Sequence, residues 1–219
     1  MYQEGMNSTN GIVLGIWRNR HEVASRAANA ITSLSQSEST NSDEFNLRLG
    51  EACFLRGVNY FELVQMFGAI PLSGMDGAGQ SNGSRQPLEV VYKMIEADFI
   101  KAEKYLPDPA DASYQDLRRA TKTLAQAMLG KLYLYAPEES GFRDYEKAAV
   151  QFEKVYNNPY YGGTGAPTYS IIFDANSQNS AQHQREMVYA FQFSNVNGDQ
   201  SSIQWDMGSR AVTNMTPVE

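Results

Sequence analysis

Between residues 11 and 156, several stretches of the chain carry apolar residues at helical spacing. The clearest stretch lies between Pro87 and Pro107, and its apolar residues fall on one face of a helix: Leu88, Val91, Tyr92, Ile95, Phe99, Ala102 and Leu106. Proline is tolerated where a helix begins but disrupts its interior, so this pattern predicts a helix over 88–105.

Related patterns predict four more helices, over 12–34, 43–67, 116–135 and 144–156, the last with Asp144 as its N-cap. The helix over 43–67 is apolar on two sides, which predicts that it lies between two neighbours. Gly50 and Gly57 interrupt it, and each costs about 1 kcal/mol relative to alanine unless a neighbouring helix approaches closely there. The helix over 116–135 is predicted to be mostly buried.

One residue within the 43–67 helix and two residues after it have specific predicted roles. Arg56 stands among apolar residues, so it needs a carboxylate or carbonyl partner, and a structural ion pair is favoured over ligand contact. Gly68 follows the helix where a positive φ is easiest for glycine, and Pro71 prevents the helix from resuming.

The succession of helices and links predicts an all-α core of stacked, tetratricopeptide-like helical hairpins over 11–156. From residue 157 the helical period is lost. One strand is predicted at 187–193, where Tyr189, Phe191 and Phe193 alternate with other residues. We therefore expect one domain over 1–219 whose last part, 157–219, is irregular and partly β.

Charge and hydropathy exclude some classes of function. The formal net charge is −7 at pH 7, which disfavours nucleic acid as a partner. No run reaches the roughly 18 apolar residues of a membrane-spanning helix, and residues 1–10 lack the features of a signal peptide. By these patterns the protein is either cytoplasmic or lacks its targeting segment in this sequence. The single cysteine, Cys53, is predicted to be a small buried apolar residue.

Metal and catalytic motifs are scarce, and we predict neither a metal nor a cofactor. The two histidines, His21 and His183, are far apart in sequence, and the glycines of the 69–87 loop lack the strand and lysine of a phosphate-binding motif. Carboxylates that could serve a glycosidase are available, although most such charges are solvated helix faces: Glu51, Glu62, Glu96, Asp98 and Asp206.

Aromatic and amide side chains are plentiful, with 13 tyrosines, 10 phenylalanines and 2 tryptophans. Tyr160, Tyr161 and Tyr169 lie in a glycine-rich segment, and Trp205 stands between Gln204 and Asp206. Planar rings stack on the apolar faces of sugars, while amides and carboxylates bind sugar hydroxyls.

Residues 51–72 read EACFLRGVNYFELVQMFGAIPL. This segment resembles the signature of the SusD/RagB family, which has an acidic-Ala pair, Phe-Leu-Arg, an aromatic pair, Leu-Val, and an aromatic-Gly step before a hydrophobic-Pro-Leu. The similarity continues through EVVY at 89–92 and RATKTLAQAMLGKLYLY at 119–135, and it covers most of 43–193. Family members are longer, so the chain is expected to be a fragment or a short member.

The resemblance implies a tetratricopeptide-like, SusD-like fold and a non-enzymatic role. Members of this family, from Bacteroidetes, capture glycans at the cell surface and pass them to a SusC-like TonB-dependent transporter. It further implies an outer-membrane location through a lipid anchor that this sequence does not contain.

The candidate carbohydrate-binding residues are five aromatic residues, each of which could instead pack in the core, and two polar residues of the long loop: Trp17, Tyr160, Tyr161, Tyr169, Trp205, Asp76 and Asn82. Two other functions stay open. A helical scaffold could bind a protein or peptide, and a glycosidase would need two carboxylates about 5–10 Å apart in one cleft.

Overall fold

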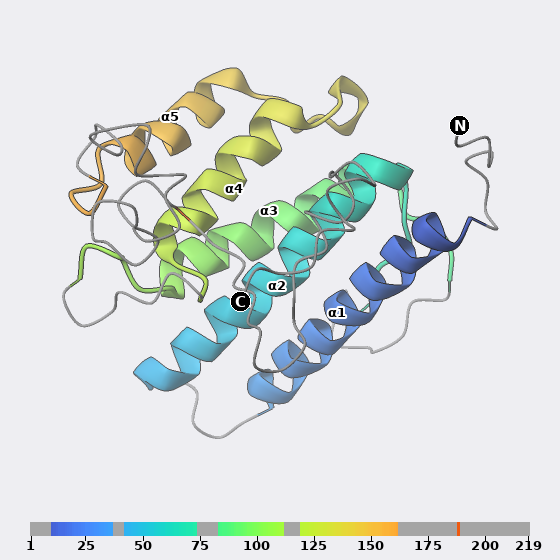
Figure 1. Cartoon of the computed structure of the whole chain (residues 1–219), viewed down its shortest axis with the longest axis horizontal. Coiled ribbons are helices and arrows are strands. Elements are labelled where there is room, and N and C mark those ends of the chain that lie inside the picture. The colour runs from blue at the N-terminus through green and yellow to red at the C-terminus, as the bar shows by residue number, and fades with distance from the viewer. Residues whose placement is uncertain (1–9, 37–41, 74–82, 112–118, 162–187, 189–219) are drawn as a thin grey trace, which may run out of the picture. The chain divides into compact units, whose positions relative to one another are not determined.

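The structure is a computed structural model that describes residues 10–36, 42–73, 83–111, 119–161 and 188. In these ranges the chain forms five α-helices and one 3-10 turn (Figure 1). They are α1 (Gly11–Ser35), α2 (Asp43–Phe67), α3 (Leu88–Tyr105), α4 (Lys122–Tyr135), η1 (Glu138–Ser140) and α5 (Tyr145–Tyr156).

Each helix packs chiefly on the next one along the chain, α1 on α2, α2 on α3, α3 on α4 and α4 on α5. Figure 1 shows α1 lying along α2 and α5 lying along α4. This succession of paired helices confirms the all-α, tetratricopeptide-like fold predicted from the sequence. All described residues belong to a unit that spans 1–189, and the second unit, 190–219, lies outside them.

Four of the five predicted helices agree with the structure to within one residue at each end. Side chains at the N-caps explain where three of them, α1, α2 and α5, begin, whereas α3 begins after Pro87 without a side-chain cap. Asn10 accepts hydrogen bonds from the backbone of Ile12 and Val13, Ser42 from Phe45, and Asp144 from Lys147.

The predicted start of the fourth helix is wrong, because α4 begins at Lys122 and not at position 116. Thr121 is extended, and its hydroxyl accepts from the backbone N–H of Leu124 at 3.2 Å. The N–H of Lys122 donates to the carbonyl of Pro107 at 2.9 Å, which ties the start of α4 to the end of α3. The capping hydrogen bond of Thr121, and not the apolar pattern of the preceding residues, therefore determines where α4 begins. The predicted burial of this helix is confirmed.

The core lies where α2, α3 and α4 meet. Its largest fully buried side chains include Tyr60, Tyr92, Phe99, Leu63 and Leu129. The glycines of α2 allow this packing: a Cβ at Gly57 would lie 2.9 Å from a ring carbon of Phe99. The expectation that a neighbouring helix requires these glycines is confirmed.

Arg56 forms the predicted ion pair. Its Nε and Nη2 donate to the two carboxylate oxygens of Asp98 on α3, at 2.8 and 2.7 Å. Both side chains are buried, and Cys53 beside them is fully buried, as predicted. Burial raises the pKa of the Cys53 thiol to about 12, so the thiol stays protonated in the folded protein.

Gly68 also agrees with its prediction. It has a φ of 68°, and its N–H donates to the carbonyl of Val64 at 3.0 Å, which ends α2. The strand predicted at 187–193 lies outside the described residues, apart from Val188, which packs against the core.

Candidate functional site

The turn that follows α5 carries two of the predicted binding residues, Tyr160 and Tyr161. Asn158, which is buried, holds this turn in place. Its Oδ1 accepts from the N–H of Tyr160 at 2.9 Å, and its backbone carbonyl accepts from the N–H of Tyr161 at 3.1 Å. Its Nδ2 donates to Asp108 Oδ1 at 2.9 Å, so the turn is fixed to the segment that follows α3.

Tyr161 points inward from this turn. Its side chain is only 7% exposed, and its hydroxyl shares a 3.1 Å hydrogen bond with the hydroxyl of Thr123 on α4. Burial raises the pKa of Tyr161 above its ordinary value, so the phenol stays neutral. Tyr160 is half-buried, and its ring meets the Tyr161 ring edge-on with centroids 5.1 Å apart. Tyr161 therefore supports the more accessible ring of Tyr160.

The Tyr160 cluster, which we define as Asp108, Thr123, Asn158, Tyr160 and Tyr161, combines an aromatic ring with amide, hydroxyl and carboxylate groups. Hydrogen bonds fix these groups relative to one another without a ligand. A fixed ring with polar groups beside it can bind the apolar face of a sugar together with its hydroxyls.

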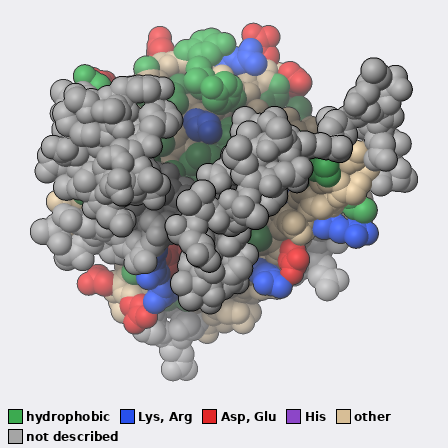
Figure 2. All heavy atoms as spheres, in the orientation of Figure 1, with side chains coloured by type: hydrophobic (Ala, Val, Ile, Leu, Met, Phe, Trp, Pro, Cys, Tyr) green, Lys and Arg blue, Asp and Glu red, His purple; other side chains and the backbone are tan. Residues whose placement is uncertain are grey.

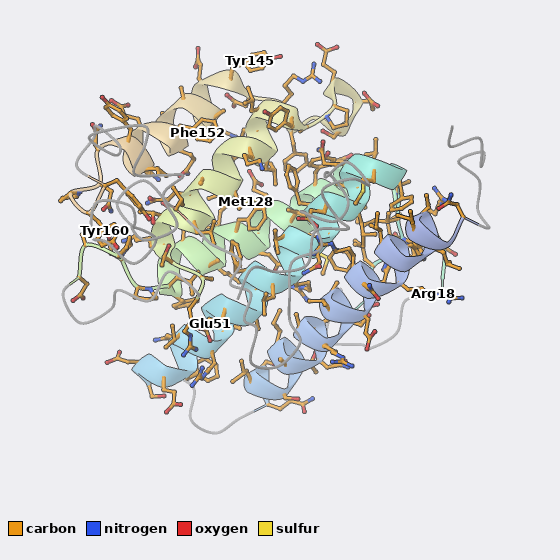
Figure 3. The ribbon with its side chains drawn as sticks, viewed as in Figure 1. Arg18, Glu51, Met128, Tyr145, Phe152 and Tyr160 are labelled. Carbon is orange, nitrogen blue, oxygen red and sulfur yellow. The ribbon has the colours of Figure 1, made fainter. Side chains whose placement is uncertain are left out.

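Trp17 lies elsewhere, on α1. Its ring is partly buried and meets the ring of Phe67 edge-on at 5.0 Å, while the ring of His21 lies 4.4 Å away. Arg18, its neighbour in sequence, and Tyr160 are at opposite ends of the helical array in Figure 3. Trp17 and the Tyr160 cluster therefore do not form one contiguous site.

The remaining candidate residues, Asp76, Asn82, Tyr169 and Trp205, lie outside the described residues, and their roles stay predictions.

The carboxylates considered for glycoside hydrolysis have partners wherever the structure describes them, and Asp206 lies outside the described residues. Glu51 pairs with Arg119, Glu62 with Arg20, and Asp98 with Arg56, while Glu96 accepts from the hydroxyl of Tyr133 at 2.7 Å.

Over the described ranges, no three His, Cys, Asp or Glu side chains are placed to hold a metal ion. No described helix is both long and apolar enough to cross a membrane. On the face shown in Figure 2, acidic and basic side chains of the described residues are interspersed.

Sequence reasoning missed a groove between α1 and α2. The groove has a volume of about 720 Å³, and its floor is made of small and aliphatic side chains, with Arg26, Arg48 and Glu51 also lining it. Its apolar lining residues are Val23, Ala27, Ala30, Leu34, Ala52 and Leu55. The helical spacing of Val23, Ala27, Ala30 and Leu34 was the available signal, but it did not distinguish a core-facing stripe from an open one.

Comparison with known proteins identifies the family. A family model described as "Starch-binding associating with outer membrane", of the SusD-like type, matches residues 1–134, which include α1 to α3 and most of α4. The chain belongs to this SusD-like family.

Individual relatives agree with this membership. SusD-like protein P2 of Formosa agariphila is 31% identical over 179 residues, which are 78% of this chain and 32% of that protein. A SusD superfamily protein from Parabacteroides distasonis has a TM-score of 0.69 at 26% identity, covering 84% of this chain and 38% of that one. A "Laminarin binding SusD-like protein" has a TM-score of 0.52 at 26% identity, covering 65% of this chain and 30% of that one. The chain thus spans about a third of the length of these relatives.

Proposed function

We propose that the protein captures oligosaccharides or polysaccharides at the cell surface without catalysing a reaction, and that it delivers them to a SusC-like TonB-dependent transporter in the outer membrane. The observation that carries this proposal is membership of a starch-binding, outer-membrane-associated family over residues 1–134. A relative named for laminarin binding supports the substrate class. Attachment to the membrane by a lipid is part of the proposal.

The Tyr160 cluster is the part of the described structure that best suits this role. Tyr160 would stack on a sugar ring, and the amide of Asn158 and the carboxylate of Asp108 would hold the turn beside it. Trp17 would contact a separate part of a long glycan, and Asp76, Asn82, Tyr169 and Trp205 would complete the site. The engaged carboxylates Glu51, Glu62, Glu96 and Asp98 support binding without hydrolysis.

A capture protein must release what it binds. Dissociation constants from millimolar to micromolar correspond to about −4 to −8 kcal/mol, which concentrates a glycan but lets it pass to a transporter. Hydrogen bonds hold the polar groups of the Tyr160 cluster before any ligand arrives, which reduces the entropy lost on binding.

Electrophoresis in native gels cast with starch, laminarin, mucin or other polysaccharides tests the proposal. We expect one glycan class to slow migration of the chain relative to a non-binding protein, and Tyr160→Ala to reduce this retardation. Tyr135→Ala is the matched control, because Tyr135 is an exposed tyrosine of α4 outside the cluster. Equal retardation of the Tyr160→Ala and wild-type chains would remove Tyr160 from the site.

A protein- or peptide-binding helical scaffold is the second candidate function, and the α1–α2 groove is the observation that favours it. Capture of a peptide that Leu55→Glu abolishes, without retardation by any polysaccharide, would establish this function instead. Leu55 lines the groove and is 46% exposed, so the substitution would leave the core intact.

A further inference from the structure

His21 occupies an unusual position between α1 and α2. Its ring lies 4.4 Å from that of Trp17 on α1 and 6.2 Å from that of Tyr60 on α2. Its Nε2 atom is fully enclosed and has no hydrogen-bond partner among the described residues. Only one other buried side-chain atom of the described residues shares this condition, Gln151 Oε1, and that group does not titrate.

Among the described residues, the acidic and hydroxyl side chains on the neighbouring turns of α1 and α2 are bonded to groups other than His21. On α1, Glu22 is paired with Arg26. On α2, Glu62 is paired with Arg20 at 2.6 Å, and the Tyr60 hydroxyl oxygen already accepts from the N–H of Ser73 at 2.7 Å. The other charges of these helix segments are cationic: Arg18 on α1 and, on α2, Arg56, which is bound to Asp98.

Neutral imidazole tolerates this environment because Nε2 can be the nitrogen without a hydrogen. Protonation gives both ring nitrogens an N–H, so the enclosed Nε2–H would be left without an acceptor among the described residues. Trp17 and Tyr60 present rings tilted at 56° and 69°, which supply no lone pair to that N–H. Burial accordingly lowers the pKa of His21 from its ordinary value of 6.5.

Helix α1, which carries His21, has small buried side chains and few polar contacts with the rest of the described chain. The buried residues of α1 are three alanines, Ala24, Ala27 and Ala28, and Trp17 is only partly buried. Its polar links to the rest of the chain are few among the described residues: Arg20 reaches Asn59 and Glu62, and Ser25 bonds to Ser73 at 3.2 Å. A local opening of α1 from α2 therefore requires less disruption than any opening at the core.

We propose that His21 makes the α1–α2 contact an acid-sensitive joint, in which protonation of the imidazole releases α1 from α2. The open state lets Nε2–H reach water, so this state binds the proton more tightly than the closed one. The opening equilibrium therefore rises as the pH falls below 6.5 and levels off once both states are protonated. Opening exposes the rings of Trp17 and Phe67 and the apolar floor of the groove. This inference does not depend on the proposed function.

Hydrogen exchange of the whole chain, measured by mass spectrometry at pH 7.5, 6.0 and 5.0 and corrected for the intrinsic pH dependence of exchange, tests the proposal. We expect exchange in α1 to rise about threefold to tenfold from pH 7.5 to 5.0, since one unit of pKa difference between the states multiplies the opening equilibrium tenfold. Exchange in α3 should stay unchanged. An α1 rate that does not respond to pH, or that rises equally in α3, would overturn the proposal.

Two variants identify the titrating group. His21→Phe keeps an aromatic ring in place and should remove the acid dependence of α1, whereas His183→Gln, which changes the chain's other histidine, should retain it. Persistence of the response in His21→Phe would contradict the proposal. If His21→Phe does not fold, an NMR titration of the wild-type imidazoles decides, because the proposal requires a His21 pKa below 6.5.

Discussion

The two sides of α2 are built differently. Toward α3, α2 presents Gly57 to the ring of Phe99 and joins Arg56 to Asp98 through two buried hydrogen bonds. Toward α1, it meets alanines, an imidazole nitrogen that has no hydrogen-bond partner among the described residues, and an open groove of about 720 Å³. The α3 side combines close approach with a directional ion pair, whereas the α1 side combines buried alanines with the partly buried ring of Trp17.

The two contacts of α2 should therefore respond differently when the chain is perturbed. The α2–α3 contact contains large interlocked side chains and a buried ion pair. We expect this contact to be lost cooperatively, because removal of either charge leaves the other charge buried without a partner. The buried residues of α1 are alanines, which bury little surface, so we expect the α1–α2 contact to contribute less free energy and to open separately.

Loss of the buried ion pair should have the largest effect. Asp98→Ala leaves Arg56 buried without its carboxylate, which should lower the free energy of unfolding by about 3–5 kcal/mol. Arg20→Ala breaks the half-exposed pair with Glu62 on the α1 side and should cost about 1 kcal/mol or less. Urea denaturation measures both, and equal losses would contradict the contrast.

Addition of one methyl group at glycine should have opposite effects on the two helices. Gly57→Ala places a Cβ 2.9 Å from the Phe99 ring, which should destabilise the protein by about 1–3 kcal/mol despite the better helix propensity of alanine. Gly15→Ala on α1 meets no atom within 4 Å and should stabilise the protein by up to about 1 kcal/mol. Thermal unfolding should show a lower melting temperature for Gly57→Ala and a higher one for Gly15→Ala. A higher melting temperature for Gly57→Ala would refute close packing at that point.

Mild acid should lower the free energy of unfolding through protonation of His21. The folded pKa of His21 lies below 6.5, so the unfolded chain binds more protons, and stability is full above pH 6.5 and falls as the pH drops toward the folded pKa. The urea midpoint should therefore decrease between pH 7.5 and 5.5, and this decrease should be smaller in His21→Phe. Identical pH profiles for the two chains would show that His21 does not contribute.

Removal of the α1 cap should have the smallest global effect. Asn10→Ala deletes the side-chain oxygen that accepts from Ile12 and Val13, which should weaken α1 by about 0.5–1 kcal/mol. Because α1 can open separately, the change should increase hydrogen exchange in α1 and leave that of α3 nearly constant. Asn10→Asp, which retains an acceptor, should behave like the wild type.

Most helix bounds could be predicted from the sequence because the apolar periods coincide with a capping residue or, at α3, with a proline before the helix. Pro87 predicted the start of α3, and Asp144 predicted the start of α5. The Arg56 ion pair was predicted because a buried arginine needs a partner. The start of α4 could not be predicted from periodicity, because the cap of Thr121 and the bond from Lys122 to Pro107 involve residues that the apolar pattern does not register.

The candidate site was less accessible to sequence reasoning. Composition indicates that aromatic residues are candidates for sugar binding. It does not distinguish Tyr161, whose side chain is buried, from Tyr160, the adjacent and more accessible residue of the same turn. It likewise could not show that Trp17 packs against Phe67 on a different part of the molecule. Such distinctions depend on contacts between distant segments, as between Asn158 and Asp108.

The central functional claim is that this SusD-like chain binds a glycan, and isothermal titration with the polysaccharide class selected by gel retardation tests it most directly. We predict saturable binding with a dissociation constant between about 1 μM and 1 mM, weakened at least severalfold by Tyr160→Ala and unchanged by Tyr135→Ala. Absence of binding to every polysaccharide at millimolar concentrations of sugar, by a chain shown to be folded, would contradict the claim.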